Sequence, residues 1–152
     1  MTGAGGMIAQ TIQLALAPVF VLVAIGNIMN ILSSRLGRVV DRSRVLQQRH
    51  AETEGSAHDA VVREIRIVDK RIHLIGRALL LLVLAGLCIG LTVVLLFVEE
   101  FAAIDVQPVA AGSFILAIAF LMNALVLFLR ETRHATEALR IPAELLEWDR
   151  KL

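Results

Sequence analysis

Three long uncharged apolar runs constrain the fold of this sequence more than any other feature. They cover residues 10–33, 78–98 and 109–129. At a rise of about 1.5 Å per residue, each of the last two would be roughly 31 Å long, close to the thickness of the hydrocarbon core of a bilayer. A backbone in lipid must satisfy its own hydrogen bonds. We therefore expect an all-α integral membrane protein with three transmembrane helices.

The overall composition agrees with a membrane location. The chain has 152 residues, of which 57% are hydrophobic, and its mean hydropathy is +0.75. A water-soluble domain of this length could not hide so much apolar surface. The net charge is only +1, which argues against nucleic acid as a partner. The single cysteine, Cys88, excludes a disulfide framework within the chain.

The basic residues predict the orientation in the membrane. All 15 lysines and arginines fall within residues 35–49, 63–77 and 130–151, whereas the connection 99–108 carries three acidic residues and no basic one. The positive-inside rule then places the N-terminal tail, residues 1–9, and the acidic connection outside. It places residues 34–77 and the C-terminal segment, residues 130–152, in the cytosol.

The cytosolic segment 34–77 has the pattern of a helical hairpin. Apolar residues recur at three- and four-residue spacing on both sides of Gly55. We expect two helices, one running from the first span to about His50 and the other from about Asp59 into the second span, with Ser56 as a candidate cap. The intervening turn is predicted to cover residues 51–58. Replacing Ile65 or Ile72 by Asp should loosen this hairpin.

The C-terminal segment should contain a short amphipathic helix. Pro142 interrupts the preceding helical pattern, and Ile141, Leu145, Trp148 and Leu152 then form one apolar stripe. We expect this helix to lie at the inner membrane interface or against the hairpin, with Trp148 at headgroup depth.

Polar residues within the first span are the strongest functional candidates. Amide side chains in a lipid-embedded helix are costly unless they face protein or water. Two interpretations stay open: hydrogen bonds to another helix, for example to Asn123 in the third span, or the lining of a pore in an oligomer. The pore-lining or interhelical set is Gln13, Phe20, Asn27, Asn30, Ser34 and Asn123.

Two further sets have structural roles in this interpretation. The basic residues expected to contact lipid headgroups are Arg35, Arg38, Arg42, Arg77 and Arg130. Gly86 and Gly90 have the four-residue spacing that lets helices approach closely in lipid.

Nothing in the sequence indicates catalysis. The four histidines do not form a metal-binding motif, no serine or cysteine has a base at a recognisable spacing, and no glycine-rich phosphate loop is present. We therefore expect a non-enzymatic protein without a metal or cofactor.

Several segments resemble a known family. They are residues 17–20 (APVF), 30–44 (NILSSRLGRVVDRSR), 71–87 (RIHLIGRALLLLVLAGL) and 128–131 (FLRE). Together they are similar to a family of small bacterial membrane proteins that is catalogued only as a domain of unknown function. The resemblance spans about residues 10–135 and implies three spans and a bacterial inner-membrane location. It implies no activity and no functional residues.

These observations favour a small homo-oligomeric channel or pore-like protein with the first span innermost, because a single copy would leave Asn27 and Asn30 without partners. The alternative is a non-conducting scaffold or adaptor whose hairpin, residues 34–77, binds a cytosolic protein.

Overall fold

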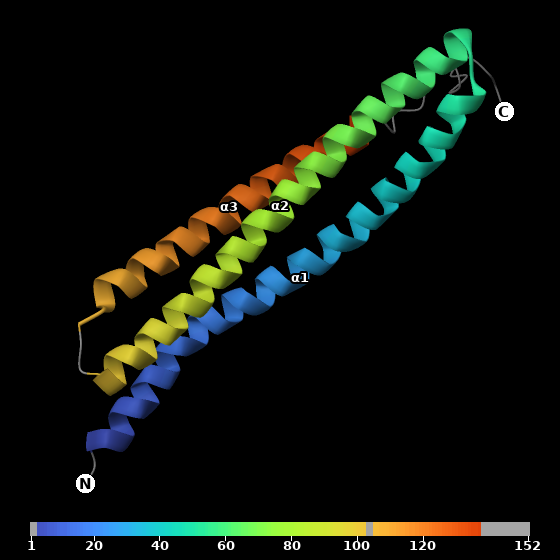
Figure 1. Ribbon diagram of the computed structural model, residues 1–152. Coiled ribbons are helices and arrows are strands. Elements are labelled where there is room, and N and C mark those ends of the chain that lie inside the picture. Colours follow the sequence, from blue (N-terminus) through green and yellow to red (C-terminus); the bar gives the residue numbers. More distant parts are fainter. Residues whose placement is uncertain (1–2, 103–104, 138–152) are drawn as a thin grey trace, which may run out of the picture.

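The computed structural model describes residues 3–102 and 105–137, with side chains for 10–102 and 105–133. It consists of three α-helices, α1 (Gly3–Glu52), α2 (Gly55–Ala102) and α3 (Gln107–Glu137) (Figure 1). All three are long and apolar enough to cross a membrane. The predicted all-α architecture, with three helices long and apolar enough to span a membrane, is therefore confirmed, and the chain has the build of a multi-pass membrane protein.

The α1–α2 connection is much tighter than the sequence indicated. Only Thr53 and Glu54 separate the two helices, in place of the predicted turn over residues 51–58. Gly55 reverses the chain with a φ of 63°, which glycine adopts without the steric cost that a Cβ would impose. The Thr53 hydroxyl donates a hydrogen bond to the Arg49 carbonyl 2.9 Å away, satisfying one of the free acceptors at the end of α1.

The opposite connection also differs from expectation. We expected Glu99 and Glu100 in a loop over residues 99–108, but α2 continues through both of them to Ala102. Between Gly90 and Ala102 the sequence contains no proline or glycine that would end the helix. At the start of α3, a carboxylate oxygen of Asp105 accepts a hydrogen bond from the backbone N–H of Gln107.

Helix α2 packs against both other helices, whereas α1 and α3 barely touch each other. α1 and α2 form one long antiparallel pair that continues beyond α3 (Figure 1). On α1, the residues facing this core recur every seven positions as Ile25, Leu32, Val39 and Leu46, and all four are buried. We call this set the α1 core stripe. A seven-residue apolar repeat is the pattern of coiled-coil packing, and here it runs without interruption from the apolar part of α1 into the hairpin.

The core stripe of α2 alternates large and small residues. Val68, Ile75, Leu82 and Ile89 again recur every seven positions, and Ala78 and Ala85 lie between them. The facing residues of α3 are small, with Ala117 and Ala124 almost completely buried. Small side chains let helices in lipid approach closely, so that backbone and side-chain contacts replace the missing hydrophobic driving force.

Helices α1 and α2 therefore pack against each other on both sides of the apolar core and as far as the turn at Gly55. Ile65 and Ile72 pack against the core as partly buried residues, whereas His50 at the end of the expected apolar pattern is exposed. The cytosolic position of the hairpin stays a prediction. The amphipathic helix around Trp148 lies outside the described residues.

Candidate functional site

The residues of α1 that were predicted to line a pore or bond to another helix lie on the side of α1 that points away from α2. Gln13, Phe20, Asn27 and Ser34 recur every seven positions, the same repeat as the α1 core stripe. Each lies two positions after a core position, which is about 200° around the helix axis. We call these four residues together with Asn30 the α1 outer stripe.

All five residues of the outer stripe are exposed in the single chain. Phe20, with 70% of its surface accessible, is among the most exposed large apolar residues. No hydrogen bond joins Asn27 or Asn30 to another described side chain, although every buried side-chain nitrogen and oxygen in the described residues has a partner. Among the described residues, the buried side-chain polar groups are thus all hydrogen-bonded, whereas the two asparagines of the outer stripe are not.

Asn123 does not supply the missing partner. Its side-chain amide donates to the Ala119 carbonyl of its own helix at 2.8 Å, and the residue is exposed. The proposed contact between the three amides is therefore absent within the described chain.

The outer stripe is flanked by small residues. Gly26 and Gly37 are exposed, and a Cβ built at either position would meet nothing within 4 Å. No close contact within the described chain therefore requires glycine at these two positions. In a lipid-embedded helix, glycines on an open face allow a second helix to approach closely.

A second polar site lies where the apolar part of the bundle ends. The carboxylate of Glu131 is completely buried and pairs with two arginines, one from each of the other helices. Arg35 Nη1 lies 2.7 Å from Glu131 Oε2, and Arg71 approaches Oε1 with Nε at 3.0 Å and Nη2 at 2.8 Å. We call these three residues the Arg–Glu–Arg cluster. It joins α1 and α3, which otherwise barely touch.

Two neighbours fix the orientation of Arg35. Its Nη1 also donates to the Thr132 hydroxyl at 3.0 Å, and its guanidinium carbon lies 5.2 Å from the centre of the Phe128 ring. The latter distance falls within the range of a cation–π contact. Thr132 in turn donates to the Phe128 carbonyl, so α3 presents a pre-ordered surface to Arg35.

The sequence analysis did not identify Glu131 or Arg71 as site residues. A signal was present, because Glu131 continues the buried repeat of Ala117 and Ala124 at a spacing of seven residues. A carboxylate at a core position is costly unless it is paired, and so it predicts a buried cation.

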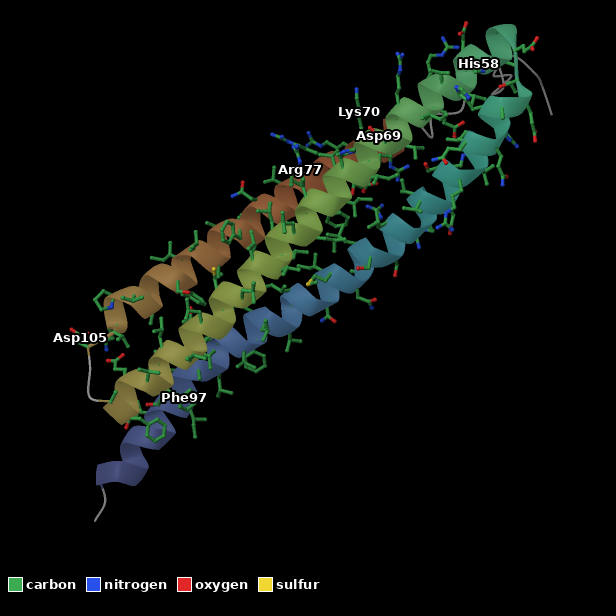
Figure 2. All side chains as sticks on the ribbon, viewed as in Figure 1. His58, Asp69, Lys70, Arg77, Phe97 and Asp105 are labelled. Atoms are coloured by element: carbon green, nitrogen blue, oxygen red, sulfur yellow. The ribbon has the colours of Figure 1, made fainter. Side chains whose placement is uncertain are left out.

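The other basic residues expected at lipid headgroups fall into two groups. Arg42 pairs with Glu64 across the hairpin at 2.6 Å, with both side chains more than two-fifths exposed. Arg38, Arg77 and Arg130 are exposed, and Figure 2 shows Arg77 and Lys70 along α2 between His58 at the turn and Asp105 at the opposite end. Their contact with headgroups stays a prediction.

The glycine pair of α2 is only partly engaged. A Cβ at Gly86 would lie 3.6 Å from the Leu22 side chain, an ordinary contact, and one at Gly90 would meet nothing within 4 Å. The close approach of α2 and α3 instead includes the Ser113 hydroxyl, which donates to the Cys88 carbonyl at 2.9 Å. The role of Gly86 and Gly90 in helix packing stays a prediction.

The end of the bundle near Asp105 has its own interhelical contact. The Thr11 hydroxyl donates to Glu100 Oε2 at 3.1 Å. Between this contact and the Arg–Glu–Arg cluster, the interior is filled by side chains such as Ile25, Leu82 and Ile89, each at most 2% exposed. A polar path through the middle of a single chain is therefore blocked.

The described residues contain no group of three or more histidine, cysteine, aspartate or glutamate side chains that could hold a metal ion. His50 and His58 do meet at the hairpin turn, with ring centres 4.3 Å apart, and His58 Nδ1 lies 3.1 Å from the Thr53 carbonyl. This pair packs the turn and extends to no third candidate ligand.

Comparison with known proteins agrees with the resemblance found in the sequence. Neither the curated proteins nor the solved structures contain a match. A family model described as a protein of unknown function (DUF2721) matches residues 15–141, which cover most of the chain, all of α2 and α3 and the larger part of α1. The chain therefore belongs to the DUF2721 family.

Proposed function

We propose that the chain assembles through α1 into a homo-oligomeric membrane pore in which the α1 outer stripe lines the common axis. The observation that carries this proposal is the position of Asn27, Asn30 and Ser34, which are exposed on the apolar part of α1 and have no partner in the described chain. Lipid cannot satisfy two amides. A shared aqueous axis can.

The repeat of the stripe supports assembly about α1. A seven-residue repeat keeps one face of a helix turned toward a supercoiled neighbour. Because the core and outer stripes share this repeat, α1 can pack on α2 with one face and on copies of itself with the other. The open faces at Gly26 and Gly37 provide room for such neighbours.

The chemistry along the stripe suits a gated conduit. Asn27, Asn30 and Ser34 would offer a neutral polar lining. Phe20, which lies two helical turns before Asn27, would form an apolar ring. Hydrophobic constrictions in pores close by excluding water. The filled interior of the single chain also favours a path between copies over a path within one.

We further propose a bacterial inner membrane as the location, with the N-terminus outside and residues 34–77 in the cytosol. The support is the placement of every lysine and arginine among the described residues at one end of the helices, together with Glu99, Glu100 and Asp105 at the other. In a Cys88→Ser background, Asp105→Cys should react with an impermeant thiol reagent added to intact cells. Reaction only after the cells are opened would overturn this orientation.

Conductance in planar bilayers tests the pore directly. The unmodified protein should conduct, and Asn27→Leu should lower the conductance while the oligomer remains intact, because leucine would dry the lining. Asn123→Leu is the matched control, since it removes an exposed amide from α3 that is already bonded to its own helix. An unmodified protein that is silent, and whose assembly fails on Asn27→Leu, would show that the stripe is a helix–helix contact and not a lining.

That outcome would favour the second candidate, a non-conducting scaffold. One observation supports it: the hairpin beyond the apolar part of the helices exposes Val45 and Ile67, at 41% and 44%. A partner protein docked there would cover both. Val45→Asp should then abolish binding of the partner protein, while Asn27→Leu leaves that binding intact. A pore predicts instead that Asn27→Leu lowers the conductance and that Val45→Asp does not.

A further inference from the structure

The Arg–Glu–Arg cluster carries one more positive charge than negative. Arg35 and Arg71 share the single carboxylate of Glu131. Among the side chains described for residues 10–102 and 105–133, no other carboxylate lies within ion-pair distance of either arginine. A partly buried cation is unfavourable unless an anion accompanies it. The excess charge therefore points to a second anion that does not come from these residues.

The two guanidinium groups have hydrogen-bond donors to spare. Arg35 uses Nη1 for Glu131 and Thr132, and Arg71 uses Nε and Nη2 for Glu131. A guanidinium has five N–H donors, so Nε and Nη2 of Arg35 and Nη1 of Arg71 make no bond to a described residue. The side chains are 26% and 24% exposed, which leaves them accessible from outside the bundle.

The position of the cluster indicates the class of anion. Arg35 directly follows the uncharged part of α1, and Glu131 lies just after the uncharged part of α3. In a bilayer this depth is the boundary between hydrocarbon and headgroups, where lipid phosphates lie. Arginine forks match phosphate oxygens in geometry as well as in charge.

We propose that Arg35 and Arg71, held in place by Glu131, form a binding site for the phosphate of an anionic lipid headgroup. Glu131 acts as a positioning residue: it orients two guanidiniums from different helices toward one outside ligand. The site would bring one lipid into contact with α1, α2 and α3 together. The proposal goes beyond the pore and does not depend on it.

The binding test uses the purified full-length protein in mild detergent, with short-chain phosphatidylglycerol titrated and bound lipid counted by native mass spectrometry. Arg71→Lys keeps the charge that pairs with Glu131 but loses the planar fork. Its dissociation constant for phosphatidylglycerol should rise by about tenfold or more, as expected when charge-assisted hydrogen bonds are lost. The matched control, Arg77→Lys, makes the same change at an exposed arginine of α2 and should bind as the unmodified protein does.

If Arg71→Lys and Arg77→Lys both bind phosphatidylglycerol like the unmodified protein, then the lipid responds only to the positive charge of the surface, and the proposed site is wrong. Circular dichroism establishes that each variant retains its helices. Arg35→Lys, which should show the same loss, replaces Arg71→Lys if the latter does not fold.

A thermal-unfolding series identifies the source of the phosphate. Phosphatidylglycerol should raise the melting temperature of the unmodified protein, whereas zwitterionic phosphatidylcholine and inorganic phosphate at equal concentration should not. Stabilisation by inorganic phosphate without stabilisation by phosphatidylglycerol would assign the site to a free anion and overturn the lipid. No effect of either anion would overturn the site itself.

Discussion

The two faces of α1 share a seven-residue repeat, but one face is packed against another helix and the other is not. The core stripe, from Ile25 to Leu46, is buried against α2 over its whole length. The outer stripe, from Gln13 to Ser34, is exposed over its whole length. One face is apolar and paired, and the other is largely polar and unpaired at a depth where lipid offers no hydrogen bonds. The difference teaches that the three-helix unit satisfies the polar groups of its interior but exposes one helix face whose amides have no partner.

The largest effect is expected for a change in the packed interior of the three-helix unit. Glu131→Gln removes the charge that holds Arg35 and Arg71 and should destabilise the protein by about 3–5 kcal/mol, the typical result of breaking a buried ion pair from one side. The measurement is unfolding in mixed micelles with increasing denaturing detergent. Glu64→Gln is the matched control: its ion pair with Arg42 is exposed and should contribute only about 0.2–1 kcal/mol. Equal losses for the two variants would contradict a special role for the cluster.

A second change tests the core stripe within the hairpin. Leu46→Ala should cost about 2–5 kcal/mol because it leaves a cavity at a residue that is 1% exposed. Its sequence neighbour Val45 is 41% exposed, so Val45→Ala should change stability by no more than about 0.5 kcal/mol. Limited proteolysis of the hairpin, alongside micelle unfolding, would show whether only the first variant loosens it.

A third change tests the α2–α3 contact. Ser113→Ala removes the hydroxyl that bonds the Cys88 carbonyl and should cost about 1 kcal/mol. The effect should stay small because Thr92 also donates to that carbonyl, at 2.9 Å, and so no buried acceptor is left unsatisfied. A loss comparable to that of Glu131→Gln would mean that α3 is held mainly by this bond.

The smallest expected effect concerns the outer stripe. Asn27→Leu should leave the stability of the individual three-helix unit unchanged to within about 0.5 kcal/mol, because the side chain is exposed and bonds to no described residue. The measurement is unfolding under conditions that keep the protein monomeric. A large loss of stability in the monomer would show that Asn27 contributes to packing within the three-helix unit, and the contrast between the two faces of α1 would disappear.

The sequence was sufficient for the elements of the fold. Uncharged runs of about 20 residues predicted helices long enough to span a membrane, and Gly55 between two apolar repeats indicated the hairpin turn. The turn was predicted too long because glycine with positive φ can reverse the chain in very few residues. Glu99 and Glu100 were placed in a loop because charge was taken as a boundary, whereas helices continue past charged residues that lie beyond the hydrocarbon.

The sequence was less informative about how the helices are rotated relative to one another. Arg35 follows an uncharged run, which fits a headgroup contact as well as a buried pair. Only the setting of three helices brings Arg35, Arg71 and Glu131 together, and these lie 36 and 60 residues apart along the chain. The faces of Asn27 and Asn30 could be deduced from periodicity, but the satisfaction of Asn123 by its own helix could not.

The uninterrupted helices have a mechanical consequence. α1 contains 50 residues, with one internal proline, Pro18, toward its N-terminal end. From Pro18 to the hairpin turn, at about 1.5 Å per residue, it is a rod of roughly 50 Å. Between Pro18 and the hairpin turn no further proline interrupts this helix, and α2 packs along it. A tilt imposed at the turn near His58 would therefore rotate this part of α1 as one body. The rotation would centre on the Arg–Glu–Arg cluster, where α1 is bound to α3. Phe20, on the other side of the cluster, would then move in the direction opposite to the turn.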